Sequence, residues 1–171
     1  RLWGRLLGLA FGLPLIALAL TGRVPNGFGR RLFLLLLLGG FQGVVGWWMV
    51  KSGLTETASV SQYRLATHLS LALIIFSLLV WTGFDLRDGC DRYPTGQGLA
   101  TLILLGITIV AGALVAGMDA GLLYNEYPLM GDSLLPIEYG KAGWLDPFEN
   151  PASAQFHHRW LGAVTFGAVI V

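Results

Sequence analysis

Five long stretches of apolar residues dominate this sequence. They cover residues 2–20, 32–50, 65–84, 99–118 and 156–171. A helix that crosses the hydrocarbon core of a bilayer needs about 20 mostly apolar residues. Because lipid cannot satisfy unpaired backbone groups, we expect each stretch to be helical, and the short alternating strands of a membrane barrel do not occur. The sequence therefore predicts an all-α fold, a polytopic transmembrane helical bundle.

The composition agrees with an integral, multi-pass membrane protein. Of the 171 residues, 54% are hydrophobic and 12% are charged, whereas a soluble domain carries about 25% charged residues. The net charge of +1 gives no reason to expect a nucleic-acid partner. The single cysteine, Cys90, excludes an intrachain disulfide and a cysteine-based metal cluster.

The two ends of the sequence resemble cuts through a longer protein. The first residue is not Met, and the last apolar stretch is still running at Ile170 and Val171. No signal peptide pattern is present at the start. We therefore expect these residues to be an internal fragment of a longer polytopic protein.

Charges in the loops predict the orientation of the helices. Loop 21–31 carries three Arg and loop 85–98 carries two, whereas loops 51–63 and 119–155 carry one Lys each. Since Lys and Arg favour the cytoplasmic or matrix side, the first two loops should face inward and the other two outward. His68 and His158 then both lie at the outer ends of their helices. The source membrane, bacterial plasma membrane or mitochondrial inner membrane, stays open.

Glycines recur at intervals of four residues in the first two apolar stretches, at Gly4, Gly8 and Gly12 and at Gly39 and Gly43. Such a face favours close packing of helices. The alternative is that it leaves room for a flat, bulky ligand.

The three histidines are the best candidates for chemistry. His68, His157 and His158 all lie near the start of apolar stretches. Imidazole is a common metal ligand, and two such residues on different helices at similar depth could bind a haem iron. The alternative for His68 is a structural or proton-handling role. His157 and His158 differ by about 100° around a helix, so at most one should face a given site.

Other polar residues have two interpretations each. Arg64 and Arg159 could snorkel to the interface, or pair with haem propionates. The long loop 119–155 could form a short element over a pocket, although Asp119 and Asn125 at its start are ordinary turn residues. The pairs Asp146-Pro147 and Asn150-Pro151 predict turns.

Several classes of site are absent from the sequence. No Gly-x-Ser-x-Gly, His-Glu-x-x-His or phosphate-binding Gly-Lys-Ser/Thr element occurs, which argues against a hydrolase or nucleotide site. No Cys-x-x-Cys-His element occurs either, so a haem would be held noncovalently. A third class of function, a transporter or a purely structural membrane subunit, would bind no haem. The near absence of charges inside the apolar stretches argues against transport.

One weak internal repeat is visible. The residues RLWG at 1–4 and RWLG at 159–162 share the order basic, apolar, apolar, glycine. If the repeat is real, the residue before Arg1 in the full protein should be His.

Six motifs resemble the haem A synthase (Cox15/CtaA) family. They are FQGVVGWWMVKSGL at 41–54, VSQYRLATH at 60–68, VAGMDAGLLYN at 115–125, PLM at 128–130, FENP at 148–151 and QFHHR at 155–159. They occur in order over nearly the whole chain, and together they are specific.

The resemblance implies eight helices in two similar four-helix halves, of which this chain covers helices two to six. Residues 1–98 would belong to the N-terminal half, and residues 99–171, with the outer loop 119–155, to the C-terminal half. His68 matches the second haem ligand of the N-terminal pair, and His158 matches the first ligand of the C-terminal pair. The other two ligands lie outside these residues. His157 falls at a variable position and receives no ligand role.

The resemblance also implies an activity, the oxidation of the C8 methyl of haem O to the formyl group of haem A for cytochrome oxidase. His68 would bind the iron of the substrate haem, and His158 that of a haem b cofactor. The family's catalytic acidic residue lies upstream, so the fragment alone should be inactive. A cysteine pair found in some members is not supported by Cys90. Expected partners are haem O, haem O synthase, the lipid membrane and an unidentified electron acceptor, with homo-oligomers left open. The alternative is a non-enzymatic bis-His di-haem electron-transfer subunit.

Overall fold

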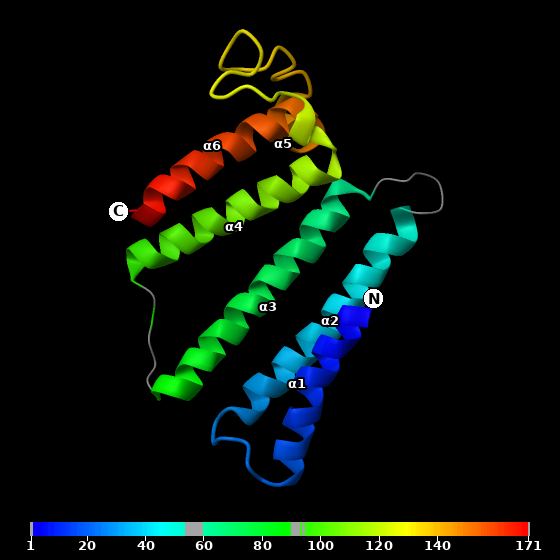
Figure 1. Cartoon of the computed structure of the whole chain (residues 1–171), viewed down its shortest axis with the longest axis vertical. Coiled ribbons are helices and arrows are strands. Elements are labelled where there is room, and N and C mark those ends of the chain that lie inside the picture. The colour runs from blue at the N-terminus through cyan, green and yellow to red at the C-terminus, as the bar shows by residue number, and fades with distance from the viewer. Residues whose placement is uncertain (1, 54–59, 90–92, 94, 171) are drawn as a thin grey trace. The chain divides into compact units, whose positions relative to one another are not determined.

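The computed structural model describes residues 2–53, 60–89, 93 and 95–170 (Figure 1). In chain order its helices are α1 (Leu2–Leu20), α2 (Gly29–Gly53), α3 (Gln62–Asp88), α4 (Gly96–Gly117), η1 (Ala120–Leu122), η2 (Gly143–Leu145), α5 (Asp146–Glu149) and α6 (Pro151–Ile170). The described residues contain no strand, and an isolated bridge joins Met130 to Ser133. The predicted all-α class is confirmed.

Some residues of the sequence argument lie outside the described residues. They are Arg1 of the internal repeat, Cys90, Arg92, residues 54–59 of the loop 51–63, and Val171.

Four of the described helices, α1 to α4, are long and apolar enough to cross a membrane. This confirms the prediction of a multi-pass membrane protein. The fifth expected stretch, 156–171, is also helical, but α6 is not one of these four. Its first two turns carry Ser153, Gln155 and both His157 and His158, and these polar side chains lower its hydropathy.

All of the long helices except α1 begin before the apolar stretches that predicted them. α1 has the predicted bounds, but α3 begins at Gln62 instead of 65 and α6 at Pro151 instead of 156. The predicted turns at Asp146-Pro147 and Asn150-Pro151 are wrong, since each proline lies in the first turn of a helix. Proline suits that position because its missing N–H would have no helical partner there.

The chain forms two compact units, and the first comprises Arg1–Trp48 and Leu71–Cys90. In this unit Gly12 is buried, and a Cβ at that position would lie 3.5 Å from Leu36 Cδ1. Gly4, Gly8, Gly39 and Gly43 have open space around them in the described part of the unit. Gly12 is therefore in ordinary van der Waals contact with α2, and close packing through the other glycines stays a prediction.

An ion pair in this first unit joins the start of α2 to the end of α3. The guanidinium of Arg31, in the first turn of α2, binds the carboxylate of Asp85 near the end of α3. The last residue of the first Arg-bearing loop, 21–31, therefore contacts the first residue of the second. The side of the membrane that these loops face stays a prediction.

Many large apolar side chains of this unit are exposed. Trp3, Leu20 and Phe76 are 77%, 84% and 63% exposed. Contiguous apolar surface of this kind is unfavourable in water but suits contact with lipid or with further helices.

The second unit comprises Met49–Ser70 and Asp91–Val171. Here α4 packs along α6, and Figure 1 shows the two helices side by side, joined by the long loop. The buried hydroxyls of Thr108 and Thr165 form a hydrogen bond of 2.7 Å between them. The division into two four-helix halves, at residue 98, stays a prediction.

The first turns of α3 pack against the end of α4 within the second unit. A Cβ on Gly117 would lie 2.4 Å from Gln62 Cα, so the two backbones almost touch. One turn further along, Ala66 packs against Ala113 and Leu114. Because the numbering rises on one helix as it falls on the other, the two segments are antiparallel.

Candidate functional site

His158 lies on α6 with its ring directed at α4. Its Nδ1 is 3.1 Å from the backbone oxygen of Thr108. A carbonyl oxygen only accepts hydrogen bonds, so Nδ1 must carry the proton and donate it. In the neutral ring this leaves the lone pair on Nε2, the tautomer that a metal ligand needs.

The ring of His158 also lies directly against Gly112. A Cβ built on Gly112 would be 2.8 Å from Cε1 of the imidazole and 3.3 Å from Nε2. The favourable separation of two carbon atoms is about 3.5–4.0 Å. The contact is therefore possible only because position 112 has no side chain.

His68 lies at a similar height in the same unit. It is two residues beyond Ala66, which packs against Ala113 on α4. His158 contacts α4 at Thr108 and Gly112. Both residues are half-buried and lie beside the same stretch of α4. That they are two ligands at one depth stays a prediction.

His157 has a different environment from His158. Its Nδ1 is 2.8 Å from the backbone oxygen of Ser153, one turn back on α6, and its Nε2 is 3.3 Å from the hydroxyl of Tyr139. The ring also stacks on Tyr139, with 5.6 Å between centroids. Both nitrogens therefore have protein partners, and the sequence analysis gave this residue no ligand role.

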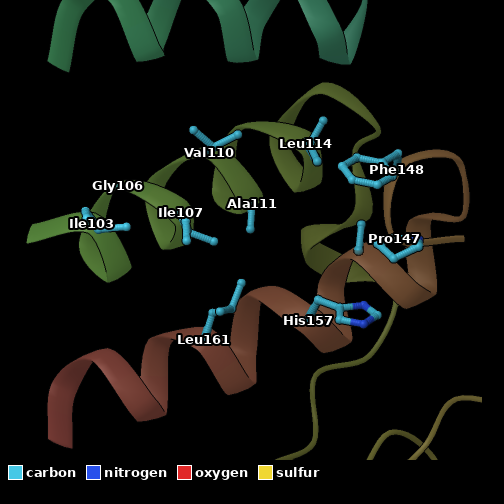
Figure 2. Close-up of a pocket in the computed structure, with 11 residues that line it drawn as sticks. Ile103, Gly106, Ile107, Val110, Ala111, Leu114, Pro147, Phe148, His157 and Leu161 are labelled. Atoms are coloured by element: carbon cyan, nitrogen blue, oxygen red, sulfur yellow. The ribbon is translucent and has the colours of Figure 1, made fainter. Parts of the chain in front are cut away.

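An apolar pocket of about 470 Å³ lies along α4 and α6 on the His157 side. Figure 2 shows Ile107 and Ala111 of α4 facing Leu161 of α6, with His157 near Pro147 and Phe148 at one end. His158 is not among its lining residues. The pocket is thus lined by His157 and not by the ligand candidate.

Gln155 ties the outer loop to the start of α6. Its Nε2 donates to the backbone oxygens of Gly121 and Tyr124, at 3.1 Å and 2.9 Å, and its Oε1 accepts from the backbone N–H of Tyr124 at 3.2 Å. The side chain is 4% exposed. One buried amide therefore satisfies three backbone groups of the loop.

Arg159 adds further bonds to the same loop. Its guanidinium donates to the backbone oxygen of Glu126 at 2.6 Å, to that of Leu129 at 3.4 Å, and to that of Tyr124. In this structure its donors thus serve the loop. Residues 155 and 159 lie on either side of His158, so the loop is anchored to the turns that carry the ligand candidate.

A second set of bonds orders the loop before α6. The buried carboxylate of Asp146 accepts from the backbone N–H groups of Gly140 and Ala142, at 2.8 Å and 3.0 Å, and from the amide of Asn150 at 2.9 Å. Asn150 in turn caps α6, its Oδ1 accepting from Ala152 N at 3.1 Å. The long loop therefore has a defined fold next to the histidines.

Two carboxyl groups of this loop have lowered pKa values. Burial by itself would raise the pKa of Asp146, but the hydrogen bonds from Ala142, Asn150 and Gly140 outweigh it and hold that pKa well below its usual range. The Tyr124 hydroxyl donates to Glu138 at 2.7 Å. That bond lowers the pKa of the Glu138 carboxyl and raises the pKa of the phenol.

The donor set fits a haem iron better than a hydrated metal ion. Across the part of the chain that the structure describes, no three His, Cys, Asp or Glu side chains form a group that could hold a metal. A noncovalent haem iron needs only axial ligands from the protein, and a histidine with its Nδ1 proton on a backbone carbonyl is suited to be one. His158 meets that condition.

Sequence reasoning missed the residues that orient the ligand candidate. Thr108 contributes its backbone oxygen, and Gly112 contributes the lack of a Cβ. Nothing in the sequence marks Thr108 or Gly112 as unusual, because α4 is an apolar helix that is rich in Ala, Gly and Thr. Gln155 could have been found from the sequence, because a polar residue one turn before a histidine is unusual near the start of an apolar stretch.

Comparison with known proteins gives a consistent family. The family model described as "Cytochrome oxidase assembly protein", COX15-CtaA, matches residues 1–171. Curated relatives named "Heme A synthase" include those of Rhodospirillum centenum, 46% identical over 96% of this chain and 46% of the relative, and Agrobacterium fabrum, 49% identical over 98% and 48%. A third, from a Caulobacter species, is 44% identical over 100% and 52%. The chain thus spans about half the length of these relatives. No solved structure matches it.

Proposed function

This chain belongs to the COX15-CtaA family of cytochrome oxidase assembly proteins, and we propose on that basis that it forms part of a haem A synthase. The relatives that carry this name match it over nearly its whole length. In this proposal the whole protein is an oxidoreductase that acts on haem. We propose that its reaction is the oxidation of the C8 methyl of haem O to a formyl group, giving haem A.

The proposed reaction proceeds through two successive oxidations of the methyl carbon. Water supplies the oxygen in each step. The first oxidation adds a hydroxyl group to the methyl carbon and releases two electrons and two protons. The second adds another hydroxyl group with the same release, and the resulting diol loses water to leave the aldehyde. The carbon formally loses four electrons in all, which an electron acceptor must take up. A haem b, when bound, supplies one-electron redox chemistry.

The observation that best supports a ligand role is the hydrogen bond from His158 Nδ1 to the backbone oxygen of Thr108. It fixes the tautomer in which Nε2 can hold an iron. We propose that His158 holds the haem b iron and His68 the iron of the substrate haem. By the family resemblance, the two further ligands and the acidic residue of the reaction would lie outside these residues.

The outer loop serves the same site by ordering the start of α6. Gln155 and Arg159 lie on either side of His158 in the sequence. Their side chains donate hydrogen bonds to backbone oxygens of the loop, those of Gly121, Tyr124, Glu126 and Leu129. Such contacts would keep the ligand side chain in one orientation for binding an iron. Haem O synthase is the proposed donor of the substrate.

The alternative function is a bis-His di-haem subunit that transfers electrons without changing its haems. The same two histidines would serve it equally, so the product decides between the two. We would supply haem O to the purified full-length protein and identify the extracted haems by mass. Haem A, or its alcohol precursor, is the result that the synthase predicts. Unchanged haem O beside haem b would favour the electron-transfer function.

A further inference from the structure

Gly112 is the residue that shapes the space around the proposed haem ligand. It lies on α4, and a side chain there would meet all three ring atoms of the Nδ1–Cε1–Nε2 edge of His158, at 3.4 Å, 2.8 Å and 3.3 Å. Apart from the chain neighbours of Gly112 and the nearby backbone of its own helix, these three ring atoms are the three nearest to that Cβ position. The imidazole edge alone therefore requires glycine at this position.

The position of this contact on the ring matters more than its closeness. Nδ1 is occupied by Thr108 O, one turn before Gly112 on the same helix. The remaining nitrogen, Nε2, is only 3.3 Å from the Cβ position. A methyl group at residue 112 would push the ring away from Thr108 and would also stand beside the nitrogen that binds iron.

We propose that Gly112 is a positioning residue for the His158 ligand: its missing side chain lets the ring reach the Thr108 oxygen and leaves Nε2 open to a haem iron. This inference rests on the proposed function for the identity of the ligand. The contact between Gly112 and the ring is independent of it. A residue that orients a metal ligand typically changes metal affinity by roughly 10- to 100-fold when it is altered.

The test uses the full-length protein with Gly112→Ala, His158→Ala and the control Gly167→Ala. Gly167 lies on the exposed side of α6 with nothing within 4 Å of its Cβ position. Both glycine substitutions gain the same helix propensity, so the comparison isolates the contact with His158. The readouts are the amount of each haem per protein and the low-spin absorption and EPR signals of the bound iron.

Gly112→Ala should lose the haem that His158→Ala loses, with affinity lowered roughly 10-fold or more, while the haem of the His68 pair remains. Gly167→Ala should match the wild type. A Gly112→Ala protein with wild-type haem content and unchanged spectra would overturn the inference.

A double-mutant cycle in thermal unfolding covers the case in which Gly112→Ala disturbs the fold. If Gly112 acts through the ring, Gly112→Ala lowers the unfolding temperature of the wild type but not that of His158→Ala, where the space is free. Equal effects in both backgrounds would mean an ordinary helix contact and would also overturn the inference. If His158→Ala keeps its full haem content, the proposed ligand role fails, and the cycle still decides the role of Gly112.

Discussion

The two adjacent histidines of α6 bind different parts of the protein. Nδ1 of His158 donates across to α4, whereas Nδ1 of His157 lies near an oxygen of its own helix, that of Ser153. Sequence periodicity predicted that the two would face different directions, because successive helical residues differ by about 100°. It could not show which one had a free nitrogen, since that depends on where backbone oxygens and Tyr139 lie in space.

Replacement of His157 by Phe should therefore leave haem binding intact. The variant loses the contacts with Ser153 and Tyr139 but keeps the aromatic stack. We expect wild-type haem content and a loss of stability of about 1 kcal/mol, typical of a hydrogen bond. Haem extraction measures the haem content, and thermal unfolding measures the loss of stability. Loss of one haem from His157→Phe, with retention in His158→Ala, would show that the ligand is assigned to the wrong histidine.

Asp146 should stabilise the outer loop over most of the pH range. Its folded pKa is lowered from the ordinary 3.8 by its hydrogen bonds. A lowered pKa means that the contribution is fully present above about pH 4 and is lost as the pH falls towards the folded value. Asp146→Asn should thus weaken the loop equally at pH 7 and pH 5, and the two proteins should converge in strong acid.

Trypsin cleavage after Lys141 measures this effect, because Lys141 is exposed and lies between the two backbone donors of Asp146. A cost of about 1–3 kcal/mol for the unsatisfied groups corresponds to roughly 5- to 150-fold faster cleavage. Asp132→Asn, at an exposed position of the same loop, is the control. A cleavage rate at pH 7 that is the same in both variants would contradict the prediction.

At the scale of elements, hydropathy located the helices but not their polar ends. α1 has the expected bounds because its two ends are apolar. The first turns of α3 and α6 were missed, because they consist of residues such as Gln62, Ser153 and Gln155. Backbone hydrogen bonding continues through such residues, and Asn150 supplies a cap that starts α6 five residues early.

The link between α6 and the loop should depend on Gln155. In Gln155→Leu the three hydrogen bonds to Gly121 and Tyr124 are lost, and buried backbone groups are left without partners. We expect the amide of Tyr124 to exchange its hydrogen at least 5-fold faster, from a cost of about 1–3 kcal/mol. Hydrogen exchange followed by mass spectrometry measures this. Gln97→Leu, at an exposed position of α4, should leave the exchange unchanged, and equal exchange in both variants would refute the link.

At the scale of the molecule, the loops and helices can be compared with the topology that the charges predicted. The chain matches about half the length of its haem A synthase relatives. The loop charges predicted which loops share a side, and the Arg31–Asp85 pair and the antiparallel start of α3 agree within their own units. Composition and spacing predicted a membrane bundle with histidines as candidate haem ligands, whereas the proposed reaction came from the six motifs, because chemistry depends on residues that lie on several helices.

We propose that His68 and His158 hold two different haems. The most direct test compares the full-length protein with its His68→Ala and His158→Ala variants, purified in detergent from cells that make haem O, with each extracted haem identified by mass and counted per protein. We predict that His158→Ala loses haem b and keeps haem O, while His68→Ala loses haem O and its products and keeps haem b. Retention of the full haem complement by both variants, or no haem in any sample, would contradict the account.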